Sequence, residues 1–322
     1  MMAKYIVLAF CFLFAGPLFV QAQISESGFS QTAAIVIEPT YPAPHSTFSA
    51  SLDDYSLSGQ TTSISWKING LTVADNNNLR TINLQSGEVG KTITIEANIG
   101  LNGNQSIVLR KTVTPTYLDI VVEPQTRTPA FYLGRGLPSI ESQVNLKAII
   151  SGTSISSNDL IYTWQVNGQV IGGGPLRGRS NVTITVPRGN SFIVSLRVTK
   201  LNGEELIKKT LRLPSVEPEV YFYEKTALYG LNPKALDSLY LTGNSATLTA
   251  EPYYLALETY NQPPLLEWTV DNKKSPVPIN NPYEITLARP DREGRGTSQI
   301  NFHIRNLKQL LQGAQRQVQV NF

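Results

Sequence analysis

The chain has 322 residues, of which 27 are basic and 24 are acidic. The basic residues are scattered among acidic neighbours instead of forming one stripe, so nucleic acid is not an expected partner. The only cysteine, Cys11, lies in the apolar N-terminal segment. The rest of the chain therefore excludes a disulfide framework, thiolate catalysis and any cysteine-ligated metal.

The first 22 residues have the layout of a secretory signal peptide. Lys4 precedes an apolar run from Tyr5 to Phe14, and Ala22 ends a small-residue cleavage site. This run is shorter than the roughly 20 apolar residues that a transmembrane helix needs. We therefore expect cleavage after Ala22 and export to the cell envelope or the extracellular space. The alternative is an uncleaved N-terminus, which would be the protein's only contact with a membrane.

A short motif recurs three times along the rest of the chain. It reads SWKING at 65–70, TWQVNG at 163–168 and, more loosely, EWTVDN at 267–272, and it contains the three tryptophans, Trp66, Trp164 and Trp268. The interval is about 100 residues, the length of one immunoglobulin-type sandwich. The Asn-Gly pairs predict two-residue hairpins, because Asn tolerates positive φ and Gly adopts it freely. We expect each tryptophan to be a core residue of its own sandwich.

Between the turn signals, apolar and polar residues alternate as in half-buried strands, for example from Phe192 to Val198 and from Ile300 to Ile304. The end of the chain, from Val318 to Phe322, has the pattern of a last strand. Only residues 307–314 favour a helical turn or two. The predicted fold is all-β, with sandwiches at residues 31–115, 116–214 and 215–322. Short proline-bearing linkers favour a semi-rigid rod.

Two resemblances carry this interpretation further. The segment YTWQVNG at 162–168 resembles the aromatic-x-Trp strand and turn of PKD-like immunoglobulin domains, although the usual Asp-Phe-Gly-Asp-Gly continuation is missing. The order of Glu-Pro, Trp-x-Val-Asn-Gly, YFYE at 221–224 and LYG at 228–230 resembles an uncharacterised family of three-module exported bacterial proteins. This second resemblance covers nearly the whole chain beyond the signal peptide. It implies three tandem immunoglobulin/PKD-like β-sandwiches and a surface or envelope role.

The residues offer little for catalysis. The two histidines, His45 and His303, fall in different predicted sandwiches, and neither forms a helical pair that could hold zinc. A Gly-x-Ser-x-Gly nucleophile motif is absent from the sequence. We therefore expect no enzyme activity, no metal and no cofactor. A hydrolase would need two carboxylates in a cleft shared by two modules, one of them with a raised pKa.

The most distinctive loop is GGGPLRGR at 172–179. The backbone N–H groups of Gly172, Gly173 and Gly174, beside Arg177 and Arg179, could cradle an anion such as phosphate. The equivalent loop of the first module, residues 74–80, is acidic and polar instead. A variable hairpin connection is the competing interpretation.

Tyrosine is concentrated in the third predicted module, and we single out Tyr221, Tyr223, Tyr253 and Tyr254. Such side chains fill a core or a joint between modules, anchor a protein interface, or stack on sugars. We expect a non-catalytic exported envelope or cell-surface protein whose modules act as spacers and bind envelope or surface proteins within a surface assembly. The alternative is a carbohydrate-binding or adhesion module that binds polysaccharide through this tyrosine-rich third domain.

Overall fold

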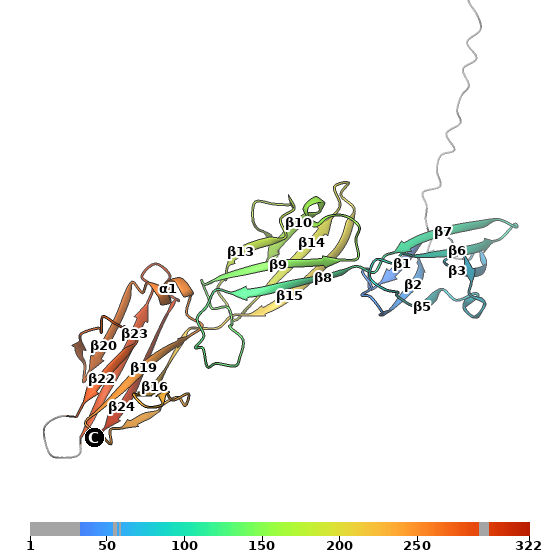
Figure 1. The fold of residues 1–322 in the computed structure, drawn as a ribbon. Helices are drawn as coiled ribbons and strands as arrows, with labels where there is room; N and C mark the ends of the chain where they lie inside the picture. The colour runs from blue at the N-terminus through green and yellow to red at the C-terminus, as the bar shows by residue number, and fades with distance from the viewer. Residues whose placement is uncertain (1–32, 54–56, 58, 290–295) are drawn as a thin grey trace, which may run out of the picture.

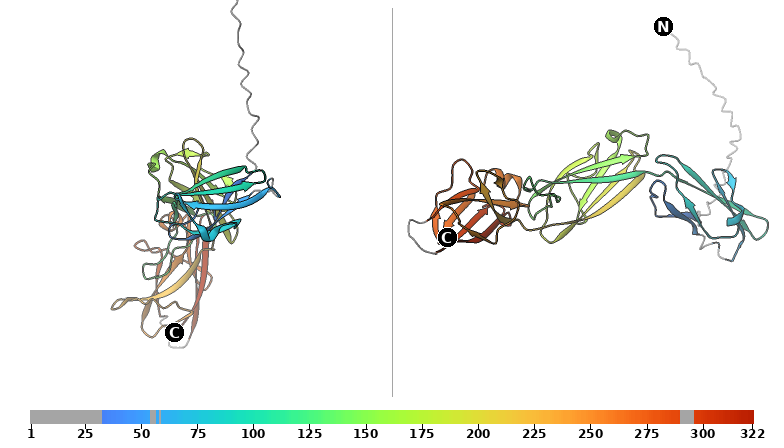
Figure 2. Two further views of the ribbon diagram at one scale, coloured as in Figure 1. Left: turned by 90° about the vertical axis from the view of Figure 1, so that its right-hand side faces the viewer. Right: turned by 60° about the horizontal axis from the view of Figure 1, so that its bottom comes forward.

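The computed structural model describes residues 33–53, 57, 59–289 and 296–322. The predicted all-β class is confirmed: the strands form six sheets, which pair into three sandwiches placed end to end in an elongated molecule (Figure 1, Figure 2). Within the described ranges the one α-helix is α1, Leu257–Asn261. None of the helices described is long and apolar enough to cross a membrane. The predicted signal peptide lies outside the described residues.

In the first sandwich, a three-stranded sheet β1-β2-β5 faces a four-stranded sheet β4-β3-β6-β7. Every pairing is antiparallel, and buried side chains alternate with exposed ones along β2 and β6, as the sequence predicts. The strands are β1 Ala34–Glu38, β2 Thr47–Asp53, β3 Thr61–Ile68, β4 Leu71–Thr72, β5 Thr81–Gln85, β6 Ile93–Leu101 and β7 Ser106–Val113.

The second sandwich repeats this plan. Sheet β13-β9-β8 faces sheet β11-β10-β14-β15, and the short β12 also pairs with β10. The strands are β8 Tyr117–Pro124, β9 Gln143–Ser151, β10 Ile161–Val166, β11 Gln169–Val170, β12 Leu176–Arg177, β13 Asn181–Thr185, β14 Ser191–Thr199 and β15 Glu205–Pro214.

The third sandwich adds a strand to each sheet. Sheet β17-β16-β19-β22 faces sheet β18-β24-β23-β20-β21, in which β18 runs parallel to β24 and covers its edge. The strands are β16 Glu219–Thr226, β17 Gly230–Leu231, β18 Ser238–Tyr240, β19 Ser245–Tyr253, β20 Leu265–Val270, β21 Lys273–Ser275, β22 Glu284–Ala288, β23 Thr297–Arg305 and β24 Gly313–Asn321.

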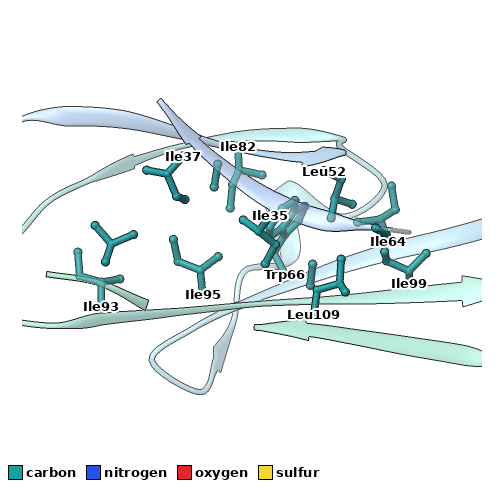
Figure 3. Packing of buried hydrophobic residues seen from close by; sticks show 14 of the residues in the cluster. Ile35, Ile37, Leu52, Ile64, Trp66, Ile82, Ile93, Ile95, Ile99 and Leu109 are labelled. Carbon is teal, nitrogen blue, oxygen red and sulfur yellow. The ribbon is translucent and has the colours of Figure 1, made fainter. Parts of the chain in front are cut away.

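Each sandwich has its own buried apolar cluster, and each cluster contains one tryptophan. Figure 3 shows the first cluster, in which Ile35 from one sheet and Trp66 from the other both point into the core. The side chains of Trp66, Trp164 and Trp268 are at most 2% exposed. Three separate cores explain why the chain forms a row of sandwiches and not one globule.

The tight turns after the tryptophan strands are confirmed. Asn69 and Gly70 both have positive φ, and so do Asn167 and Gly168. Each pair connects two strands whose flanking residues are directly paired. The looser third copy makes the same turn with two non-glycine residues at positive φ.

The expected helical turn at 307–314 is wrong. Residues 307–312 form bends and a turn that connect β23 to β24, and residues 313 and 314 already belong to β24. The side-chain oxygen of Asn306 accepts hydrogen bonds from the backbone N–H groups of Lys308 and Gln309, at 2.9 and 3.1 Å. Such local side-chain bonds give the backbone an alternative to a helix.

Candidate functional site

The tyrosines singled out in the sequence lie where the second and third sandwiches meet. Residues 125–142, which connect β8 to β9 and are called the joint loop below, extend to the third sandwich (Figure 1). There Arg127 exchanges backbone hydrogen bonds with the segment after β19: its N–H donates to Leu255, and its carbonyl accepts from Tyr254, each at 2.7 Å. The joint loop is thus paired with the third sandwich by its main chain.

Aromatic rings fill this joint. Phe131 and Tyr132 of the joint loop meet Tyr223 and Tyr253 edge to face, with ring centroids 5.0 and 5.3 Å apart. The hydroxyl groups of Tyr223 and Tyr253 lie 2.7 Å apart, and those of Tyr132 and Tyr254 lie 2.9 Å apart. Tyr223 and Tyr253 are only 4% and 8% exposed. These rings pack against one another and present no free face to a sugar.

Tyr221 lies at the margin of this cluster. Its ring meets Tyr253 edge to face at 5.4 Å, and the guanidinium of Arg316 lies 5.1 Å from its centroid. Its hydroxyl donates to the Glu219 carboxylate at 2.7 Å, and this bond, together with burial, raises the pKa of Tyr221. Burial is the first cause of the raised pKa values of Tyr253 and Tyr254. The hydroxyl groups of all four tyrosines singled out in the sequence therefore have hydrogen-bond partners within the molecule.

A charged pair also crosses the joint. A guanidinium nitrogen of Arg127 lies 3.3 Å from the carboxylate of Glu251, and the same guanidinium lies 4.6 Å from the ring centroid of Tyr260. Burial raises the pKa of Glu251, while the attraction of Arg127 acts in the opposite direction. Removing one partner of this partly buried pair would leave an uncompensated charge in the joint.

Gln312 forms a second set of hydrogen bonds across the joint. Its side chain is fully buried, and its amide nitrogen donates to the Ser139 hydroxyl at 2.9 Å and to the carbonyl of Ile140. Its carbonyl oxygen accepts from the backbone N–H of Ala256 at 2.8 Å. One amide therefore satisfies groups on the joint loop and on the third sandwich at the same time.

The first joint is more open. Tyr41 packs against the core of the second sandwich and donates its hydroxyl to the Glu205 carboxylate. Gly152 lets the second sandwich approach Pro115 closely, because a Cβ at this position would lie 2.8 Å from the carbonyl oxygen of Pro115. Beside these contacts is a cleft of about 730 Å³, lined by β1, β7 and the β14–β15 hairpin.

Two carboxylates, Glu204 and Glu205, line this cleft, and each has a partner. The hydrogen bond with Lys200, 2.8 Å long, holds the pKa of Glu204 below its usual range. Glu205 accepts the Tyr41 hydroxyl. Among the described residues, no group of three His, Cys, Asp or Glu side chains is placed to hold a metal ion.

The glycine-rich loop is a separate feature on the second sandwich. Gly172, Gly173 and Gly174 all have positive φ, as consecutive turn residues require. Arg177 forms an ion pair with Asp159, and Arg179 donates to the carbonyl of Gly172 at 2.7 Å. An anion bound here would have to displace these partners. The backbone carbonyl of Arg179 also accepts a hydrogen bond from the indole N–H of Trp164 at 3.1 Å, so this loop supports the core.

The sequence interpretation missed the residues that meet the tyrosines. Arg127, Phe131 and Tyr132 lie in a proline-rich connection without strand periodicity, and Gln312 lies in the segment for which a helix is predicted. Their partners are far away along the chain: the separation is 124 residues for Arg127, 122 for Tyr132 and 173 for Gln312. The one visible signal is the pair of adjacent aromatic residues inside an otherwise non-periodic connection.

Comparisons with known proteins give a likeness of fold only. No protein-family model and no curated protein matches the chain. Solved structures that match include fibronectin(III)-like modules of CbhA from Clostridium thermocellum, at 11% identity and a TM-score of 0.28, covering 56% of this chain and 93% of that one. The central fibronectin-III array of RIM-binding protein matches at 10% identity and a TM-score of 0.28, covering 90% of this chain and 95% of that one.

A third match is the glucan-utilization protein SGBP-B of Bacteroides ovatus, solved with a mixed-linkage heptasaccharide, at 13% identity and a TM-score of 0.23. It covers 89% of this chain and 70% of that one. At such scores we draw no conclusion about function. The chain is a tandem array of immunoglobulin-like β-sandwiches.

Proposed function

We propose that the protein is a non-catalytic, exported spacer that holds binding surfaces at a fixed distance from its point of attachment in the cell envelope. The observation that carries this proposal is the second joint. Its buried Gln312 amide, its aromatic cluster and the Arg127–Glu251 pair connect two sandwiches by side chains that would otherwise be left unsatisfied. A simple tether between independent modules needs none of these contacts.

The test is a distance measurement between spin labels on adjacent sandwiches. Cys11 is the only cysteine, so a Cys11→Ser chain accepts labels at chosen exposed sites: Leu71→Cys, Lys147→Cys and Lys273→Cys, one in each sandwich. We expect a narrow distance distribution between positions 147 and 273, because the second joint is hydrogen-bonded and buried. The Gln312→Ala change should broaden it.

The comparison is a chain in which a Gly/Ser linker joins the same two sandwiches. The spacer proposal is refuted if the distance distribution between positions 147 and 273 is as broad in the unaltered chain as in this one. The pair 71 and 147 reports on the first joint by the same method. Its more open contacts predict a broader distribution than that of the second joint.

The proposed partners are envelope or surface proteins. Cross-linking in intact cells of the native organism, followed by mass spectrometry, tests this part separately. Reproducible links to a few envelope proteins are the expected result. If the chain is found in the cytoplasm, with no links to envelope proteins, then export and this role are both wrong.

A further inference from the structure

The internal repeat allows the outer faces of the three sandwiches to be compared row by row. In each sandwich the residue after the core tryptophan pairs across the sheet with one residue on each of the next two strands. In the first sandwich this row is Lys67, Glu96 and Arg110. Arg110 and Glu96 form an ion pair at 3.0 Å, so two of the three side chains are paired with each other.

The same row of the second sandwich is Gln165, Ser195 and Thr210. The hydroxyl groups of Ser195 and Thr210 are 3.0 Å apart and hydrogen-bonded. In this row, too, two of the three side chains pair with each other.

The row of the third sandwich differs. It consists of Thr269, Asn301 and Gln317, and within the described parts of the chain these three side chains have no hydrogen-bond or ion-pair partner. Above and below this row the same two strands place further neutral amides, because alternate residues of β23 and β24 point to one face. The amides on this face are Gln299, Asn301, Gln315, Gln317, Gln319 and Asn321. We call this set, together with Thr269, the amide face.

The amide face is neutral. Its charged neighbours lie toward one end: His303 and Arg305 follow Asn301 on the same face of β23, and Glu267 and Lys274 pair with each other at 2.5 Å. Arg316 points to the opposite side of the sheet, over the ring of Tyr221. Between that end and Tyr240, β23 and β24 place no charged side chain on the face, so a neutral ligand would meet no uncompensated charge from these strands there.

An exposed aromatic ring lies at the end of the amide face. Tyr240 of β18 pairs with Asn321 of β24 and so shares its side of the sheet, and its side chain is 70% exposed. The surface between Thr269, Asn301 and Gln317 is hollowed by about 490 Å³. A shallow hydrogen-bonding surface with an aromatic ring at one end is suited to a long ligand.

We propose that the amide face binds a neutral polysaccharide. Each carboxamide both donates and accepts hydrogen bonds, which matches the hydroxyl groups of a neutral sugar, and the phenol ring of Tyr240 offers a surface on which a sugar ring stacks. Protein interface cores are instead enriched in aromatic residues, Met and Arg. The four tyrosines singled out in the sequence take no part, because they are packed in the second joint. This site does not depend on the spacer role.

The test is affinity electrophoresis of the full chain in gels containing a neutral β-glucan, a mannan or an arabinoxylan. Polygalacturonate serves as the anionic comparison. We expect at least one neutral polymer to retard the protein and polygalacturonate to leave its mobility unchanged. The Asn301→Ala/Gln317→Ala double variant should weaken the retardation about tenfold, the order of magnitude for losing one or two hydrogen bonds. Tyr240→Ala should weaken it as well.

The matched control is Thr210→Ala, which changes the same row position on the second sandwich and should bind like the unaltered chain. Circular dichroism melts show whether each variant is folded. The proposal is wrong if no neutral polymer retards the protein, if only polygalacturonate does, or if the variants bind unchanged. It is also wrong if the variants lose cross-links to an envelope protein while no polymer binds, because the face would then be a protein interface. The spin-label distances are unaffected by any of these outcomes.

Discussion

Each core tryptophan fills the space between two sheets and also donates one hydrogen bond. The indole N–H groups of Trp66, Trp164 and Trp268 donate to backbone carbonyl groups at 2.9, 3.1 and 2.9 Å. The acceptor in each case lies in the connection that follows the hairpin. The recurring tryptophan therefore fixes a loop as well as a core, which explains why indole is used at all three sites.

Replacing Trp164 tests this double role. Trp164→Ala should lower the free energy of unfolding by about 3 to 5 kcal/mol, because it leaves a cavity. Trp164→Phe should cost less, because it keeps most of the apolar volume and loses the indole bond. Urea unfolding followed by circular dichroism gives both values. Leu71→Ala, at a 75% exposed site, is the control and should change little; equal effects of Trp164→Ala and Leu71→Ala would contradict the core assignment.

Tyr41 makes the first joint sensitive to alkaline pH. Burial and the bond to Glu205 raise the pKa of Tyr41 to about 12. Because the folded pKa lies above the ordinary value of 10.0, the stabilisation by this phenol is complete below pH 10 and disappears as the pH rises through about 12. A tyrosinate absorbance titration should therefore lose one high-pKa group in Tyr41→Phe. The loss of a group that titrates near the ordinary value of 10.0 instead would mean that Tyr41 is solvated.

At the scale of elements, the hairpins after the tryptophan strands differ in how well their residues suit the backbone. Gly70 and Gly168 have φ near +83° and +81°. In the third sandwich the corresponding residue is Asn272, with φ +64°. Asparagine tolerates this region less well than glycine does.

Exchanging these residues should therefore have opposite effects. Asn272→Gly should raise the free energy of unfolding of the third sandwich by up to about 1 kcal/mol, and Gly70→Asn should lower that of the first by a similar amount. No atom lies within 4 Å of a Cβ placed on Gly70, so backbone conformation alone is tested there. Thermal melts of both variants give the comparison. The same sign for both changes would show that positive φ does not control these turns.

The elements that sequence predicted best are those with local signals. Alternation places the last strand of the chain, and Asn69-Gly70 fixes a turn with two adjacent residues. The joint loop has no such signal, because its structure depends on partners such as Tyr254 and Gln312 that are distant in the chain. The amides of β24 are visible in the sequence as an alternating series. That the row of Thr269, Asn301 and Gln317 differs from its counterparts is visible only once the registers of all three sandwiches are compared.

For the whole molecule, the three sandwiches form an elongated array (Figure 2). A single compact globule of about 300 residues would have a radius of gyration near 19 Å. Small-angle X-ray scattering should give a clearly larger value, because three cores lie in a row. A value near 19 Å would mean that the sandwiches fold back on one another in solution.

Gln312 controls how the second and third sandwiches stay together. Gln312→Ala leaves the Ala256 N–H and the Ile140 carbonyl buried without their partner, at a cost of about 1 to 3 kcal/mol for each group. Hydrogen exchange in residues 125–141 should therefore become faster, while exchange in the two cores stays slow. Gln315→Ala, at an exposed site, is the control. Uniform acceleration throughout the third sandwich would show that Gln312 supports the fold and not the joint.

The joint loop also has a consequence for biosynthesis. Because synthesis begins at the N-terminus, the second sandwich can fold before the third has emerged, and domains generally fold in that order. Phe131 and Tyr132 are then already synthesised when their partners Tyr223 and Tyr253 emerge. The second sandwich thus serves as a scaffold on which the nascent third sandwich closes its end. Reversing the order of the two sandwiches in a gene would remove that scaffold and leave a cluster of tyrosines exposed to aggregation.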